Sequence, residues 1–183
     1  MNLMIAHPHN LIEIRRQALQ VDIDNRKSAA ERNRLGQYAT PNALAVDIAR
    51  YVASLIDPPD NGIRFADPAI GTGSFFSAAI SIFGSARITN AVGVELDRVF
   101  ADAARSLWAD SGLEVVRGDF TRIVANDSRP AAPNVILANP PNVRHHHMNR
   151  DDKERLQTLA YQMTGIRVNG LAGLYVYFLL LAT

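Results

Sequence analysis

The residues with the clearest potential for chemistry are Asn139, Pro140 and Pro141, which follow a short apolar run over 135–138. Two prolines fix the backbone and remove two N–H donors, so this segment offers mainly acceptors. The side-chain oxygen of Asn139 and the carbonyl of Pro140 could each accept one hydrogen of a planar amine such as that of adenine. Such contacts localise the nitrogen lone pair for in-line attack on a sulfonium methyl, without a metal or a strong base. Asn-Pro-Pro by itself is also compatible with a structural loop.

A glycine turn and a carboxylate indicate an adenosine-containing cofactor. Gly71 and Gly73 follow an apolar run over 63–66, and Glu95 ends the next such run. The turn alone is compatible with a tight connection or a nicotinamide dinucleotide site, but Phe76 stands where that site needs a third glycine. Glu95 can accept hydrogen bonds from both hydroxyls of a ribose.

Asp119 and Phe120 follow a third apolar run and could bracket an adenine. The carboxylate would accept from the adenine amino group, and the ring would lie against the base. Taken alone, Asp119 is more typical of a turn residue than of a binding residue. Its place in series with the glycine turn and Glu95 favours the binding interpretation.

These residues need a scaffold, and the hydrophobic pattern predicts one. Apolar strands alternate with helices, which is typical of an α/β fold with a doubly wound, mostly parallel sheet. Ligands bind outside the carboxyl ends of such strands, so the polar residues at the strand ends should meet in one crevice. The predicted strands cover 63–66, 91–94, 113–116 and 135–138, with helices starting near Phe75, spanning 99–108 and spanning 171–182.

The N-terminal part is predicted to be helical and to play a packing or linker role. A helical lead is expected over 10–34, and a further helix begins at Thr40-Pro41, with the Thr40 hydroxyl as its cap. Asp57-Pro58-Pro59 ends this helix and is interpreted as a loop, because Asp60 follows where a catalytic tetrapeptide would have an aromatic residue. We therefore expect a lead over 1–34 and a catalytic domain over 35–183.

The composition of the chain excludes several kinds of protein and binding site. The chain has 183 residues, 48% hydrophobic and 20% charged, with a net charge of +1 and no cysteine. A net charge of +1 gives no sign of the strongly basic surface that is typical of proteins that bind nucleic acid. The lack of cysteine excludes disulfides and thiolate metal sites. No metal is predicted at His145, His146 and His147, because adjacent histidines point in different directions. The apolar run over 171–182 is too short to span a bilayer, so we expect a cytoplasmic protein without membrane contact.

The ordered motifs are Gln37-Tyr38-Ala39-Thr40-Pro41, Asp67 to Phe75, Glu95, Asp119-Phe120 and Asn139-Pro140-Pro141. This set resembles that of the γ-arranged DNA adenine-N6 methyltransferases, including members attached to type II restriction–modification systems. The resemblance implies a class I, Rossmann-like methyltransferase fold, S-adenosylmethionine as cofactor and double-stranded DNA as partner.

The resemblance also implies a role for each residue. Glu95 would bind the ribose of the cofactor, and Asp119 with Phe120 its adenine. The catalytic set would be Asn139, Pro140, Pro141 and Asn142, at which a flipped adenine is received. The methionine end of the cofactor would be held by Tyr38, Thr40, Pro41, Asp67, Pro68, Ala69, Gly71 and Gly73.

Three departures from the family are visible. Ile70 replaces a common cysteine, a small apolar change. Asn142 stands where the family carries an aromatic that stacks on the extruded adenine, which predicts impaired transfer. The family fold needs three more strands and a target-recognition domain after the segment that ends at Thr183. We therefore expect a fragment or truncated product, incomplete after the fourth strand, whose open edge could support self-association.

Two alternatives remain open. One is a methyltransferase that acts on a protein glutamine or on RNA, because these targets also present a planar amine. The other is a non-catalytic remnant that binds cofactor or DNA, which Asn142 and the missing strands favour.

Overall fold

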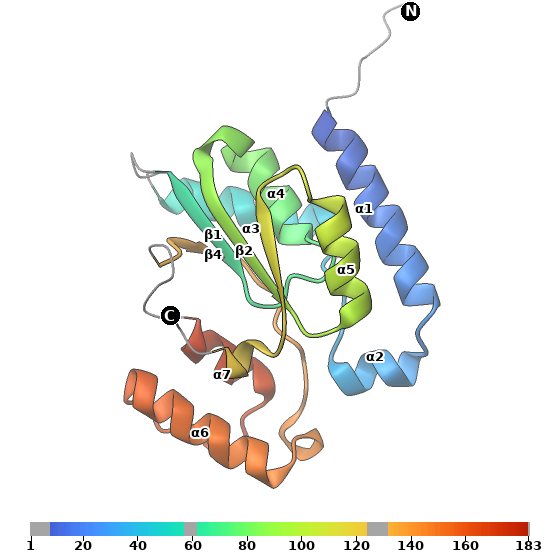
Figure 1. Cartoon of the computed structure of the whole chain (residues 1–183). Coiled ribbons are helices and arrows are strands. Elements are labelled where there is room, and N and C mark those ends of the chain that lie inside the picture. Colours follow the sequence, from blue (N-terminus) through green and yellow to red (C-terminus); the bar gives the residue numbers. More distant parts are fainter. Residues whose placement is uncertain (1–7, 57–61, 124–131, 183) are drawn as a thin grey trace, which may run out of the picture.

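The computed structural model describes residues 8–56, 62–123 and 132–182, which form a four-stranded parallel sheet in the order β3-β2-β1-β4 (Figure 1). β1 lies between β2 and β4, so the first strand of the chain is central. This arrangement confirms the predicted α/β fold with a parallel sheet. The elements are α1 (Pro8–Asn25), α2 (Ala29–Leu35), α3 (Asn42–Leu55), β1 (Ile63–Asp67), α4 (Ser74–Phe83), η1 (Ser85–Arg87), β2 (Ile88–Glu95), α5 (Arg98–Leu107), β3 (Leu113–Arg117), η2 (Phe120–Arg122), β4 (Val135–Ile136), η3 (His145–His147), α6 (Arg150–Thr164) and α7 (Leu174–Leu181).

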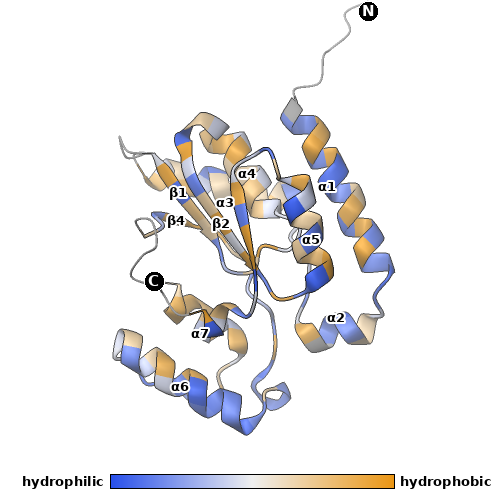
Figure 2. Cartoon of the chain, viewed as in Figure 1, coloured by the Kyte–Doolittle hydropathy of each residue, from blue (hydrophilic) through white to orange (hydrophobic). Residues whose placement is uncertain are grey.

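The core lies between the sheet and the helices α3, α4 and α5. Figure 2 shows the hydrophobic residues that the strands and α4 contribute to it. Alternate residues of β1 are buried, as expected when one face of a strand packs against helices. Phe65 of β1 contacts Phe76 of α4, with ring centroids 5.6 Å apart, and Phe76 meets the edge of Trp108 at 5.1 Å. Phe100 and Trp108 lie at helical spacing among apolar residues, which predicts that they belong to the core, and both are buried.

The predicted helical lead over 10–34 is two helices rather than one. Ser28 begins α2 with a capping box, because its hydroxyl accepts from the N–H of Glu31 while the Glu31 carboxylate accepts from the N–H of Ser28. The lead also packs on the catalytic domain, since α1 contacts α4 and α5. The predicted Thr40 cap is wrong by one residue: Pro41 is the cap position of α3, and no side chain caps it.

Strand bounds differ from prediction where polar residues or the site intervene. β2 begins at Ile88, three residues early, because Ile88 and Asn90 pair with β1 although Thr89 and Asn90 break the apolar run. Thr89 lies at a register shift between these two pairs. β4 ends at Ile136, two residues early; the N–H of Leu137 still donates to the carbonyl of Ala66 at 3.2 Å before the chain leaves the sheet. The predicted Asp57-Pro58-Pro59 loop lies outside the described residues.

The last two helices pack on each other and on η2, at the carboxyl end of the sheet. α7 covers 174–181, within the helix predicted over 171–182, and buries Tyr177 and Phe178. The apolar run also predicts that Tyr175 is buried, but this residue is 53% exposed because it lies on the outer face of this short helix. Within the described ranges, no helix has the length and apolar character needed to cross a membrane.

Candidate active site

A cavity of about 600 Å³ opens at the carboxyl ends of the strands, as a parallel sheet predicts. A smaller hollow of about 50 Å³ shares several lining residues with it, Asn139 and Gly71 among them. Thr40 and Asp67 line the smaller hollow but not the larger cavity. Four predicted site residues line neither space: Pro41, Gly73, Pro140 and Asn142. The other predicted site residues line the cavity: Tyr38, Pro68, Ala69, Gly71, Glu95, Asp119, Phe120, Asn139 and Pro141.

The two glycines of the turn after β1 have different tasks. Gly71 has a φ of +55° and lines the cavity, and a Cβ added there would meet no atom within 4 Å. The missing side chain therefore leaves space that a ligand can fill. Gly73 has a φ of +94°, and its Cβ would lie 2.4 Å from Nε1 of Trp108. That indole N–H donates to the carbonyl of Thr72 at 2.9 Å, so Gly73 lets the turn pack against the core.

Glu95 ends β2 beside this turn. One carboxylate oxygen accepts from the N–H of Gly71 at 2.9 Å, and the other accepts from the N–H of Asp97 at 2.8 Å. Each carboxylate oxygen has a second lone pair, so both can accept one more hydrogen bond from a pair of ribose hydroxyls. Burial raises the pKa of Glu95, although the two backbone N–H groups favour its charged form.

Asp67 ends β1 below the hollow. Its side chain is 2% exposed and accepts from the N–H of Ala69 at 2.9 Å. Burial raises its pKa to about 8, and the nearby carboxylate of Glu95 adds to the rise. Asp67 is therefore mainly protonated at neutral pH and is suited to orient the turn or to donate a hydrogen bond.

Asp119 has a local structural task at the start of η2. One oxygen accepts from the N–H of Thr121 at 2.9 Å and from its hydroxyl at 2.7 Å. The other accepts from Nε of Arg122 at 3.2 Å. These contacts confirm that Asp119 is a turn residue. It also lines the cavity, and its contact with an adenine stays a prediction. The ring of Phe120 lies 5.2 Å from that of Phe178 in α7.

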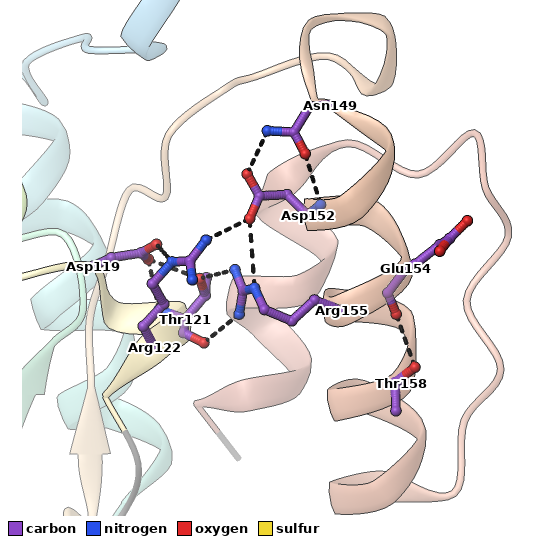
Figure 3. A network of polar contacts seen from close by, with 8 residues as sticks. All are labelled: Asp119, Thr121, Arg122, Asn149, Asp152, Glu154, Arg155 and Thr158. Carbon is purple, nitrogen blue, oxygen red and sulfur yellow. Dashed lines mark hydrogen bonds and ion pairs between the residues drawn. The ribbon is translucent and has the colours of Figure 1, made fainter.

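A polar network joins η2 to α6 at the far wall of the cavity (Figure 3). Arg155 donates to the carbonyl of Thr121 at 2.9 Å and to its hydroxyl at 3.0 Å, and Arg122 donates to Asp152 at 2.6 Å. Asn149 caps α6 by accepting from the N–H of Asp152. The mixed charges of residues 151–155 by themselves predict only a solvated helix start. That interpretation is wrong for Asp152 and Arg155, which line the cavity, because their partners come from a segment thirty residues away.

The Asn-Pro-Pro segment is held by the segment that follows α2. Nδ2 of Asn139 donates to the carbonyl of Tyr38 at 3.0 Å. Oδ1 accepts no hydrogen bond from any residue that the structure describes, so the acceptor remains available at the cavity. The N–H of Asn142 donates to the carbonyl of Gly36 at 3.3 Å, and a Cβ at Gly36 would lie 2.5 Å from that nitrogen. Gly36 thus permits a close backbone approach that positions the predicted catalytic residues.

Sequence reasoning missed a group of polar residues at the N-terminal side of the cavity. Lys27 forms an ion pair with Asp97, donates to Gln37 at 2.9 Å and lies 4.6 Å from the ring centroid of Phe100. Burial alone would raise the pKa of Asp97, but the hydrogen bonds from Lys27 and Gln37 outweigh it and lower that pKa. Gln20 of α1 also lines the cavity. The charges of the lead over 1–34 nearly balance, so its sequence carried no signal for these contacts.

The three adjacent histidines form the short helix η3, and His147 lines the cavity. Among the described residues, no group of three or more histidine, cysteine, aspartate or glutamate side chains is placed to hold a metal ion.

The fold is that of class I S-adenosylmethionine-dependent methyltransferases. A Listeria monocytogenes protein assigned to that class superposes over 100% of this chain and 51% of its own, with a TM-score of 0.68 and 16% identity. The methyltransferase subunit of a type I restriction–modification system from Streptococcus thermophilus superposes over 78% of this chain and 31% of its own, with a TM-score of 0.58 and 16% identity. These likenesses confirm the predicted fold class.

A comparison of sequences finds a relative among the methyltransferases of restriction–modification systems. The type II methyltransferase M.XamI of Xanthomonas campestris pv. amaranthicola is 29% identical over 152 residues, which are 80% of this chain and 27% of that protein. The chain thus spans about a quarter of the length of this relative. No family model matches the chain. The predicted relationship to methyltransferases of restriction–modification type is confirmed by these similarities.

Proposed function

We propose that this chain is the cofactor-binding and catalytic segment of a DNA adenine-N6 methyltransferase that uses S-adenosylmethionine. The observation that carries the proposal is the orientation of Asn139. Its amide nitrogen donates to the carbonyl of Tyr38, which leaves its oxygen as the unused acceptor, and the residue lines the hollow beside the glycine turn. A relative named as a type II methyltransferase supports the same assignment.

The cavity fits the cofactor in size and in chemistry. Its volume of about 600 Å³ lies within the usual range of small-molecule sites, roughly 300–1,000 Å³. The open space at Gly71 and the two remaining lone pairs of Glu95 suit a ribose, and Asp119 with Phe120 would hold the adenine. The methionine end would then lie near Thr40, Asp67 and the glycine turn.

In the proposed reaction, the cofactor supplies an electrophilic methyl group on a sulfonium. Asn139 and Pro140 accept the two hydrogens of the target amine and hold its nitrogen in line with that methyl. Since the Tyr38 carbonyl fixes the Asn139 amide before substrate arrives, the acceptor is preorganised. The N–CH3 bond would form as the S–CH3 bond breaks, and S-adenosylhomocysteine would leave as a neutral thioether. The two oxygens would stabilise the positive charge that develops on the nitrogen, whose extra proton would then pass to solvent.

A second candidate function is a non-catalytic cofactor-binding protein, which Asn142 favours. This residue is exposed, and it cannot supply the stacking face expected at that position.

Two predictions about partners remain: that the chain binds double-stranded DNA, and that it self-associates through the edge of β4. Light scattering tests self-association, and a strictly monomeric protein would contradict it.

The test begins with calorimetric titration of the chain with S-adenosylmethionine. Saturable binding is expected, with a loss of at least about tenfold in Glu95→Ala, because two buried acceptors for the ribose disappear. Glu114→Ala is the matched control, since Glu114 is an exposed glutamate of β3 outside the cavity lining. A folded chain that does not bind the cofactor would overturn the proposal.

The substrate is tested by offering duplex DNA, RNA and a glutamine-containing peptide, each with the cofactor, and identifying products by mass spectrometry. N6-methyladenine in DNA supports the proposal. Methylated RNA or glutamine would replace the substrate class, and cofactor binding without any product would favour the non-catalytic function.

A further inference from the structure

We propose that α1 forms part of the cofactor site and that Gln20, with Asp24, binds the amino-acid end of S-adenosylmethionine. This inference rests on the proposed function, because it names residues for one end of the same cofactor. The sequence suggested only a packing or linker role for this helix.

The position of Gln20 is the first argument. Gln20 lines both the large cavity and the adjoining hollow, and Asp24, one turn further along α1, lines the large cavity. The hydroxyl of Thr72 in the glycine turn donates to the Gln20 amide oxygen at 2.8 Å. The Gln20 amide nitrogen donates to the Asp24 carboxylate at 3.0 Å. Gln20 therefore connects the glycine turn to a carboxylate at the cavity wall.

The rigidity of α1 is the second argument. Arg16, one turn before Gln20, is 3% exposed and pairs with the buried Glu13 through two hydrogen bonds of 2.7 and 2.8 Å. Its remaining nitrogen donates to the hydroxyls of Thr72 at 3.0 Å and Ser74 at 2.8 Å. The helix is thus anchored to the same turn that Gln20 contacts, so Gln20 is preorganised at the cavity.

The order of the strand ends indicates which end of the cofactor lies there. Asp119 and Phe120 follow β3, Glu95 ends β2, and the glycine turn follows β1, in the sheet order β3-β2-β1. With the adenine at β3 and the ribose at β2, the amino-acid end lies at β1, where Gln20 contacts Thr72.

The chemistry of the two side chains suits that end. The amino-acid end carries an ammonium and a carboxylate. The carboxylate of Asp24 can accept from the ammonium. The Gln20 amide nitrogen has two hydrogens, of which one is donated to Asp24. The other makes no hydrogen bond with any residue in the described ranges, and it can be donated to the carboxylate of the cofactor.

Two ligands separate this inference from the proposed function. S-adenosylhomocysteine contains the amino-acid end, whereas 5′-methylthioadenosine lacks it but keeps the adenine and ribose. Binding of each is measured by calorimetry. We expect Gln20→Ala to weaken S-adenosylhomocysteine about tenfold and to change 5′-methylthioadenosine less than about twofold. Gln20→Glu, which keeps the acceptor for Thr72 but replaces the donor by a negative charge, should show the same selectivity.

Gln17→Ala is the matched control. Gln17 is also a glutamine of α1 with one hydrogen bond to a carboxylate, that of Glu13, but it lies outside the cavity lining. It should bind both ligands as the unmodified chain does. Equal weakening of both ligands by the Gln20 variants, or no weakening of either, would overturn the inference while leaving the proposed function intact. Failure of the unmodified, folded chain to bind either ligand would instead overturn the proposed function.

Discussion

Replacing Arg16 by methionine is expected to destabilise the fold strongly. The guanidinium is buried between α1 and the glycine turn, where it donates two hydrogen bonds to Glu13 and one each to Thr72 and Ser74. Methionine has a similar length but donates none of them. The substitution therefore leaves a buried carboxylate without its cation and two buried hydroxyls without a donor.

The magnitude follows from what Glu13 retains. Removing one partner of a buried ion pair typically destabilises a protein by about 3–5 kcal/mol. Glu13 keeps hydrogen bonds from Ser77 at 2.5 Å and Gln17 at 2.8 Å. Burial raises the pKa of Glu13, and at present the hydrogen bond from Arg16 does most to reverse this and keep that pKa low. Without Arg16, Glu13 can take up a proton, which limits the loss. We expect about 3 kcal/mol, a large part of the roughly 5–15 kcal/mol of a typical domain.

The assay is urea unfolding at neutral pH, followed by the fluorescence of Trp108, the single tryptophan of the chain. Arg26→Met is the control, because the side chains of the Arg26–Asp22 pair are 69% and 49% exposed and such pairs contribute at most about 1 kcal/mol. The double variant Arg16→Met/Glu13→Leu should regain most of the loss, since it removes the unpaired charge. A loss below about 1 kcal/mol for Arg16→Met, or a double variant no more stable than the single one, would refute this reasoning.

Two further predictions concern the site. Because burial raises the pKa of Asp67 from 3.8 to about 8, the folded protein keeps a proton that the unfolded chain releases, and this stabilisation is lost as pH rises from about 4 to about 8. In the unmodified protein, the free energy of unfolding should therefore fall with pH over this range, and Asp67→Asn should remove up to about 1.4 kcal/mol of that fall per pH unit. Urea unfolding of both proteins at about pH 5.5 and 7.5 measures the difference. An equal pH dependence in the two proteins would contradict this prediction. Asn142→Tyr should raise adenine methylation by roughly five- to 150-fold in a radiolabel transfer assay, because a stacking face is worth roughly 1–3 kcal/mol; unchanged rate and DNA affinity would exclude a stacking role.

The sheet could be predicted because buried strands consist mainly of apolar residues, which appear in the sequence as short apolar runs. The runs over 63–66 and 113–116 match β1 and β3 to within one residue. The prediction failed at the start of β2, where Asn90 pairs with Arg64 of β1 without being apolar. It failed at the end of β4 because the chain turns away to bring Asn139 to the carbonyl of Tyr38.

The sequence by itself determined the order of the strand ends and therefore which chemical groups meet at one edge of the sheet. Glu95, Asp119 and Asn139 could be assigned to that edge because all carboxyl ends of parallel strands lie together. Only the tertiary structure decided how these groups are oriented and what else joins them. The contacts of Arg16 with Thr72 and of Arg155 with Thr121 join residues 56 and 34 positions apart. Hydrophobic periodicity records which face of an element is buried, but it carries no information about which polar partner a distant segment supplies.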